Sequence, residues 1–280
     1  MKQRLRYWLG LDRLEQRQNK LLLAQARTLA TIQREWCSIP TLAQAEYSIY
    51  SQWGEDGILD WLIEQFPNIP QSFVELGCGD YEECNTRLLM ELRNWSGTVI
   101  DATPASIAHI RQQDYYWRHD LTAQCFHINK DALPHVPPDL GVLSIDLDGM
   151  DYWIWHSLTV MPWIVVCEYN AVFGFERAVT VPYREDFDRT QAHHSNLYFG
   201  ASLPALRKLA GAKGYTFIGT ESHGCNAFFV RNELAATLSI QHYTEAASKF
   251  REARTQEGQL FYPPAASRAA LIAHLPLEEV

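Results

Sequence analysis

The sequence predicts an α/β protein with a Rossmann-like, doubly wound sheet of seven strands. From residue 72 to 168, short β-branched and aromatic runs alternate with helix-forming segments, which is typical of parallel strands joined by helical crossovers. The first run ends in Gly77 and Gly79, a pattern in which backbone amides approach a ligand at a tight turn. The last two runs are joined by a short glycine-containing turn, which predicts a C-terminal antiparallel hairpin at the sheet edge.

A helical arm is expected before the sheet, within residues 1–38. Apolar side chains recur at three- and four-residue steps between residues 10 and 36, namely Leu11, Leu14, Leu21, Leu22, Leu29, Ile32 and Trp36. Gln18 and Gln25 dilute this stripe, which suits a short coiled coil or a helix docked on a partner. A helix packed on its own domain remains an alternative. The basic start of the arm, at Arg4 and Arg6, also suits contact with anionic lipid.

The remaining elements follow in order. A turn at 51–54 opens a helix that runs to Phe66 and stops at Pro67. Strands are expected at 72–76, 97–101, 124–128, 141–146, 163–168, 215–219 and 226–231. Helices are expected between them at 84–94, 104–113, 150–159 and 201–213. This assigns residues 39–235 to the α/β domain and residues 236–280 to a helical C-terminal extension.

Composition and charge exclude several classes of protein. Of 280 residues, 47% are hydrophobic and 20% charged, as in ordinary globular proteins, and no apolar run approaches the ~20 residues of a membrane span. The N-terminus lacks the apolar core of a signal peptide, and the six cysteines form no C-x-x-C pair, so we expect a reducing, cytoplasmic location. Residues 1–36 contain eight Lys/Arg and three Asp/Glu, whereas the whole chain has a net charge of −9. The acidic body argues against a nucleic-acid substrate.

The order of these motifs resembles the class I S-adenosylmethionine-dependent methyltransferases over about residues 70–232. Within that class the chain resembles the FkbM-type enzymes. The residues that carry the resemblance are Val-Glu-Leu-Gly-Cys-Gly-Asp at 74–80, Asn-Thr at 85–86, Ser-Ile-Asp-Leu-Asp-Gly-Met-Asp at 144–151 and Val-Val-Cys-Glu-Tyr-Asn at 165–170. The resemblance implies S-adenosylmethionine as cofactor and methyl transfer, with an oxygen of a sugar or other polyhydroxylated intermediate as the expected acceptor.

The resemblance also implies which residues bind the cofactor. The first motif would line its methionine and ribose part, through Glu75, Gly77, Gly79 and Asp80. Asp101 ends the second strand, where an acid roughly 20 residues after the glycines accepts hydrogen bonds from ribose hydroxyls. Asp131 would lie near the adenine. Tyr81 stands where the third glycine is usual, so a side chain there is expected to narrow the pocket or close over it.

Oxygen ligands follow the fourth and fifth strands. Asp146 and Asp148 end one, and Glu168 and Asn170 end the next. In an extended backbone each pair points to one side, because side chains alternate with period two. Converging carboxylates need protons or a cation, and their hard oxygens suit Mg²⁺, Mn²⁺ or Ca²⁺. The layout resembles metal-dependent O-methyltransferases. The alternative is that these acids bind loop amides and cap the following helix.

Methyl transfer to a hydroxyl also needs a base. His193 and His194 lie in the polar segment before the last helix, and His223 lies in the hairpin turn. The acceptor is expected to be a small molecule or a glycan, and residues 1–36 offer a surface for homo-oligomers or a docking partner. Two other functions remain open. The Asp146-x-Asp148 spacing also fits a metal-dependent sugar-nucleotide glycosyltransferase, and a body that only binds would be a non-catalytic scaffold.

Overall fold

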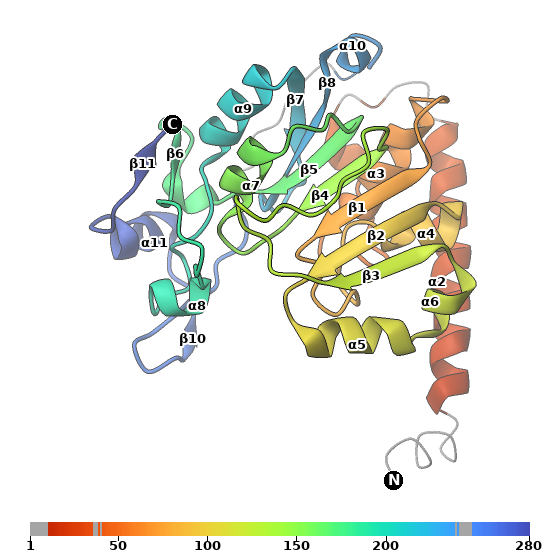
Figure 1. The fold of residues 1–280 in the computed structure, drawn as a ribbon, viewed down its shortest axis with the longest axis horizontal. Helices are drawn as coiled ribbons and strands as arrows, with labels where there is room; N and C mark the ends of the chain where they lie inside the picture. Colours follow the sequence, from red (N-terminus) through yellow and green to blue (C-terminus); the bar gives the residue numbers. More distant parts are fainter. Residues whose placement is uncertain (1–10, 36–38, 40, 239, 241–247) are drawn as a thin grey trace.

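The seven-stranded sheet is present in the computed structural model, which describes residues 11–35, 39, 41–238, 240 and 248–280. Its strand order is β3-β2-β1-β4-β5-β8-β7 (Figure 1). The strands are β1 Ser72–Leu76, β2 Ser96–Asp101, β3 Leu121–Cys125, β4 Val142–Ile145, β5 Ile164–Glu168, β7 Tyr215–Thr220 and β8 Asn226–Arg231. The first five are parallel, and β8 runs antiparallel between β5 and β7. The predicted Rossmann-like sheet with its terminal hairpin is confirmed.

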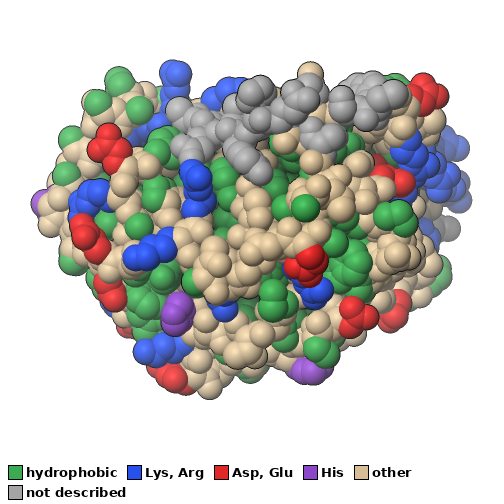
Figure 2. Space-filling view, turned by 90° about the horizontal axis from the view of Figure 1, so that it is seen from above, with side chains coloured by type: hydrophobic (Ala, Val, Ile, Leu, Met, Phe, Trp, Pro, Cys, Tyr) green, Lys and Arg blue, Asp and Glu red, His purple; other side chains and the backbone are tan. Residues whose placement is uncertain are grey.

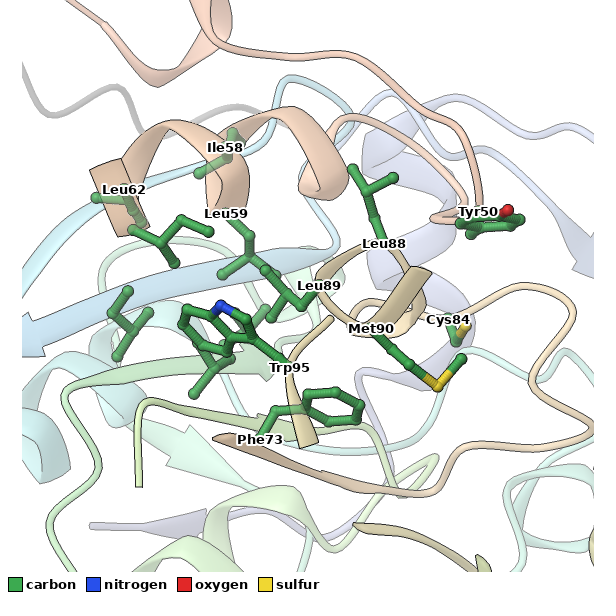
Figure 3. Close-up of a cluster of buried hydrophobic side chains, with 14 of the residues drawn as sticks. Tyr50, Ile58, Leu59, Leu62, Phe73, Cys84, Leu88, Leu89, Met90 and Trp95 are labelled. Atoms are coloured by element: carbon green, nitrogen blue, oxygen red, sulfur yellow. The ribbon is translucent and has the colours of Figure 1, made fainter. Parts of the chain in front are cut away.

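Helices cover both faces of the sheet. One face packs against α3 (Glu55–Glu64), α4 (Arg87–Arg93), α5 (Pro104–Gln112) and α6 (Asp114–Arg118), and the other against α7 (Asp151–Ser157) and α9 (Leu203–Ala212). Alternation along β5 supplies both cores, since Ile164 and Val166 face one cluster while Val165 and Cys167 face the other. Figure 3 shows the first core, where Leu59 of α3 and Leu89 of α4 lie near Trp95.

Strand β3 begins and ends three residues earlier than expected. The ladder pairs Gly97 with Leu121 and Asp101 with Cys125. This register buries Leu121 and Ala123 and leaves Cys125 exposed. The prediction followed the apolar residues Phe126 and Ile128, but they lie beyond the strand. An edge strand has one neighbour, so its register follows β2 rather than its own composition.

The arm forms the helix α2 (Leu11–Arg34), which confirms the predicted helix. Residues 1–10 of the arm and Trp36 lie outside the described residues. Its inner face packs on α3 and α4 through Ala26 and Ala30. The Gln33 amide donates to Ala45 O at 2.6 Å. No helix in the described parts of the chain has both the length and the apolar character needed to cross a membrane.

A second, smaller layer is built from the insertion after β5 and the C-terminal extension. The insertion contains η2 (Ala171–Phe173), β6 (Val179–Thr180) and α8 (Arg189–Ala192). The extension was expected to be helical. Helix α10 (Asn232–Ala235) precedes it. In the described part of residues 236–280 the extension contains one helix, α11 (Ala265–Ile272), and three short strands, β9 (Ala253–Arg254), β10 (Leu260–Phe261) and β11 (Glu278–Glu279). Strand β11 pairs with β6, so the end of the described chain lies on the insertion (Figure 1).

Candidate cofactor and acceptor site

The glycine turn after β1 is locked to the end of β2. Gly77 has φ 83°, and a Cβ there would lie 1.6 Å from the carbonyl oxygen of Asp146, so only glycine fits. Gly79 has φ 52° and faces open space. Its amide donates to Asp101 Oδ2 at 3.0 Å, and Thr103 N donates to Asp101 Oδ1 at 2.7 Å. The turn, the predicted ribose acid and the end of β4 are therefore neighbours.

Tyr81 neither narrows this turn nor closes over it. The residue adopts the left-handed conformation expected of a glycine, with φ 64°, but its side chain is fully buried in the core. Its hydroxyl lies 3.0 Å from Thr86 Oγ1, and its ring meets Tyr115 edge-on at 6.0 Å. The third glycine position is thus filled by a core side chain that turns away from the open side of Gly79.

The Glu75 side chain is buried and forms its hydrogen bonds within the fold. The carboxylate accepts hydrogen bonds from the Asn85 amide at 2.8 Å, from the Thr86 amide at 3.2 Å and from the Thr86 hydroxyl at 2.5 Å. It therefore holds the start of α4, and complete burial raises its pKa. The role of Glu75 as a cofactor ligand stays a prediction.

The other two predicted cofactor residues are exposed. Asp80 closes a local turn by accepting from the Glu82 amide at 3.1 Å. Asp131 lies in a tight turn after β3, where Asn129 Oδ1 accepts from its amide. This loop contacts the insertion, because Lys130 N donates to the Tyr183 hydroxyl at 3.2 Å. Both carboxylates are accessible to a ligand.

Three predicted metal ligands come together at the ends of β4 and β5. One carboxylate oxygen each of Asp146, Asp148 and Glu168 lies within 4.8 Å of the others. Burial raises the pKa of Asp146, and the nearby charges of Asp151 and Asp148 raise it further. Burial and the Asp146 charge likewise raise the pKa of Glu168. Glu168 Oε2 is buried and has no hydrogen-bond partner in the described structure. The cluster thus favours a proton or a cation.

Arg189 of α8, which was not among the predicted site residues, supplies a cation to this cluster. Its Nη1 lies 2.9 Å from Asp148 Oδ1 and 3.8 Å from Glu168 Oε1. The guanidinium also stacks on the Phe199 ring at 3.7 Å. Burial opposes the charged form, but Glu168 and Asp148 outweigh it and raise the pKa of Arg189. No spacing in the sequence marks this residue, since it reaches the cluster from a long irregular insertion.

Asn170, the fourth predicted ligand, is committed to the backbone of the insertion. Its amide nitrogen donates to Leu197 O at 2.8 Å and to Phe199 O at 2.9 Å, while its oxygen accepts from Val172 N at 3.0 Å. The side chain fixes the chain near Arg189 instead of joining the carboxylates. Without this side chain these backbone groups would be buried without partners. The role of Asn170 as a metal ligand stays a prediction.

Asp151 shapes the loop between β4 and α7. Its carboxylate accepts from the amides of Leu147 at 2.6 Å and Gly149 at 3.1 Å, so it binds loop amides, as the alternative for these acids proposed, but it does not cap α7. Burial raises its pKa to about 6. Gly149 cannot be replaced without movement, since a Cβ there would lie 2.2 Å from the Phe187 ring of the insertion. The carboxylate loop and the insertion therefore pack directly on each other.

The three histidines lie in two places. His193 Nδ1 and Ser195 Oγ form a hydrogen bond of 2.7 Å. The centroid of the His193 ring lies 4.1 Å from that of His194 and 6.0 Å from that of His274. Burial and these two neighbours lower the pKa of His193. This pair therefore contacts the C-terminal extension. His223 stacks on Trp53 at 3.8 Å, and its Nδ1 is buried without a hydrogen-bond partner in the described residues.

Comparison with known proteins finds similarity among solved structures alone; no family model and no curated protein matches the chain. One similar structure is magnesium protoporphyrin IX methyltransferase (ChlM) from Synechocystis PCC 6803 with bound SAM, at 11% identity and a TM-score of 0.42, covering 63% of this chain and 77% of that one. Another is an S-adenosylmethionine-dependent methyltransferase from Clostridium acetobutylicum ATCC 824, at 8% identity and a TM-score of 0.41, covering 63% and 90%.

A third is the N-terminal domain of EvdMO1, solved in the presence of SAH and D-fucose. Its identity is 12% and its TM-score 0.42, with 63% of this chain and 82% of that chain covered. The strand order, rather than any of these similarities, carries the assignment of the fold.

Proposed function

We propose that this protein is an S-adenosylmethionine-dependent methyltransferase that acts on an oxygen of a sugar or another polyhydroxylated biosynthetic intermediate. One observation carries the proposal: the open glycine turn, closed by Asp101, lies against the end of β4 where the carboxylate cluster begins. Gly77 contacts the backbone of Asp146, and Asp146 N donates to Leu76 O at 2.9 Å. Ligands of open α/β sheets bind at this edge, beyond the carboxyl ends of the strands.

In this proposal the two halves of the site have separate tasks. The cofactor supplies an electrophilic methyl group on a positively charged sulfur. Asp101 would accept hydrogen bonds from the ribose hydroxyls of the cofactor, and the turn at Gly79, where a Cβ would meet no atom within 4 Å, would leave room for it. Asp146 and Glu168 orient the acceptor hydroxyls by accepting their hydrogen bonds, which places one oxygen for attack. Substrate class and oxygen specificity are part of the proposal.

A divalent cation fits the same cluster by its donor chemistry. Asp146, Asp148 and Glu168 offer hard oxygens, and the unpartnered Oε2 of Glu168 is a group that a cation would satisfy. Bound there, the cation would lower the pKa of an acceptor hydroxyl. Arg189 is the cation that the fold itself brings to these carboxylates. We therefore propose that a divalent cation assists methyl transfer at this cluster. The Mg²⁺ response of an Arg189→Gln variant tests this part of the proposal.

For the base, we favour His223 among the three predicted histidines. It lies three residues before Asn226, which is the ladder partner of Glu168, and its Nδ1 lacks a partner in the described structure. His193 and His194 instead lie against the extension, through His274.

The deciding experiment is calorimetric titration with S-adenosylmethionine and S-adenosylhomocysteine, with and without Mg²⁺. We expect micromolar binding, and we expect Asp101→Ala to weaken it at least about 100-fold, because two ribose hydrogen bonds to a charged acceptor are lost. Asp139→Ala is the matched control, since this exposed acid precedes β4 at the opposite edge. Absence of binding by the native protein would contradict the proposal and favour a non-catalytic scaffold.

A further inference from the structure

The outward face of α2 joins an apolar stripe to a basic one. Leu14, Leu21 and Ile32 are 62%, 68% and 44% exposed. They share a side of the helix, because seven and eighteen residues are close to whole numbers of turns. Ala26 and Ala30, which are buried against the domain, mark the opposite side. A stripe of large apolar side chains therefore faces outward along a helix about 36 Å long.

Cations lie beside this stripe at a seven-residue spacing. Arg13, Lys20 and Arg27 are all exposed, and Arg17 lies between them and the leucines. Among the side chains that the structure describes, none of the four has a carboxylate partner. Arg34, seven residues after Arg27, does pair with Glu64 at 2.8 Å. Figure 2 shows a group of Lys and Arg side chains on the side of the molecule where α2 stands in Figure 1.

A tryptophan extends the surface on the neighbouring helix α6. Trp117 is 71% exposed, and the Arg118 guanidinium lies over its ring at 4.8 Å. Arg118 pairs with Asp114 at 2.7 Å, and Asp114 accepts from Gln16 of α2 at 3.0 Å. Gln16 is two residues from Leu14 and so lies on the other side of α2, next to the row of Arg13, Lys20 and Arg27. These contacts therefore place Trp117 near the cations and away from the leucines. Exposed tryptophan beside arginine is the side-chain chemistry of a membrane interface.

We propose that this outward face of α2, with its leucines and cations, binds an anionic phospholipid surface. Charge complementarity decides the occupant: the α2 sequence has five Lys/Arg against two Asp/Glu, whereas the chain as a whole is at −9. Anionic headgroups attract the arm and repel the acidic body, which fixes the orientation of the protein. Leucines between the cations enter the headgroup region while the arginine and lysine stems reach to the phosphates.

A second copy of the chain suits this face less well. The positions between Leu14, Leu21 and Ile32 on the 4-3 spacing are Gln18, Gln25 and Thr28, all exposed. Polar residues at half of such positions weaken a coiled-coil seam. Self-association is therefore treated as a competing outcome of the test.

The test is co-sedimentation of the full chain with phosphatidylcholine vesicles, with and without roughly one third phosphatidylglycerol. We expect binding only to the anionic vesicles, and loss of it as salt rises from about 0.1 M to about 0.5 M. The triple variant R13Q/K20Q/R27Q should bind on the order of 100-fold more weakly, because each cation near an anionic surface adds a similar binding free energy and three of them are removed. The variant L14S/L21S/I32S should also bind more weakly but keep the salt dependence.

A matched control removes three exposed arginines from the insertion and the C-terminal extension, on the far side of the molecule (Figure 1). This variant, R177Q/R184Q/R254Q, has the same net charge as the α2 triple variant and should bind like the native protein. Equal loss in both triple variants would overturn the proposal, because net charge alone would then explain binding. Sedimentation with the neutral vesicles would also overturn it. The same holds if the native protein binds neither kind of vesicle and forms a dimer that L14S/L21S/I32S dissociates.

Discussion

Single residues decide how the carboxylate cluster is stabilised. Asp146, Asp148 and Glu168 bring three acids within 4.8 Å, while Arg189 contributes one cation. Burial of Asp146 and Glu168 favours their neutral forms, which is why the pKa of each is raised. Because one guanidinium cannot balance three carboxylates, the site retains an affinity for protons, for a divalent cation or for the hydroxyl groups of an acceptor.

Replacing Arg189 by Gln tests whether this cation and a metal compete for the same oxygens. We expect Arg189→Gln to lower the free energy of unfolding by about 2 kcal/mol, between the values for exposed and buried ion pairs, because Asp148 is exposed while Glu168 is not. In thermal-shift assays, Mg²⁺ should then raise the Tm of the variant more than that of the native protein.

Arg184→Gln is the matched control for that experiment. Arg184 lies in the same insertion but pairs with the exposed Asp186. Its loss should change neither Tm nor the response to Mg²⁺ appreciably. A variant at Arg189 that is destabilised yet indifferent to Mg²⁺ would remove metal assistance from the proposed function.

Between elements, the start of α3 meets the hairpin turn through two buried acids. Glu221 accepts hydrogen bonds from the amides of four successive residues, 223–226, and so holds the β7–β8 turn. Glu55, the first residue of α3, accepts from Asn226 Nδ2 at 2.8 Å and from Trp53 N at 3.0 Å. Burial, together with the Glu221 charge, raises the pKa of Glu55 to about 7.

This raised pKa makes stability depend on pH. The folded protein holds a proton on Glu55 that the unfolded chain releases near pH 4.5. The associated stability is complete below about pH 4.5 and is lost as pH rises through about 7. Glu55→Gln should remove this loss, because a glutamine amide does not titrate, while its oxygen can still accept from Asn226 Nδ2.

Urea unfolding of Glu55→Gln and the native protein at pH 5 to 8 measures the effect. Their difference in unfolding free energy should grow with pH by about 3 kcal/mol. Glu83→Gln, a change at an exposed position that removes the same charge, should give a pH-independent difference. A flat difference for Glu55→Gln would show that this carboxylate is ionised across the range.

For the whole molecule, the C-terminal segment holds the insertion that carries Arg189. The Tyr198 hydroxyl donates to Pro276 O at 2.5 Å, and β11 pairs with β6. Lys208 Nζ donates to the carbonyl oxygen of Val280 at 2.7 Å, and Arg177 pairs with Glu279 at 2.9 Å. The seven-stranded sheet takes no part in these contacts, so the insertion and the sheet are expected to differ in local stability.

Deleting residues 276–280 should therefore loosen the insertion without unfolding the sheet. We expect faster amide exchange over residues 177–199, measured by mass spectrometry, and unchanged exchange in β1, β4 and β5. Tyr198→Phe removes one of these contacts and should give a smaller change in the same segment. Faster exchange throughout the sheet would show that the two layers unfold together.

The sequence alone determined the central architecture because its signals are local. Apolar runs of strand length, the glycines at 77 and 79 and the acid at 101 lie within a few residues of the structures they specify. The same holds for Asp146, Asp148 and Glu168, which meet because parallel strands end at one edge. The strands were placed within one residue at each end, including β7 at the other edge of the sheet, except β3, which is displaced by three residues.

Only the tertiary structure decided the roles that depend on distant backbone. Arg189 reaches the cluster, Asn170 is taken by the insertion, and Glu75 holds the start of α4. Tyr81 turns into the core although its backbone has the conformation of a glycine. In each case a buried donor, acceptor or ring had to be satisfied by whatever the fold brought near, and sequence spacing does not encode that neighbour.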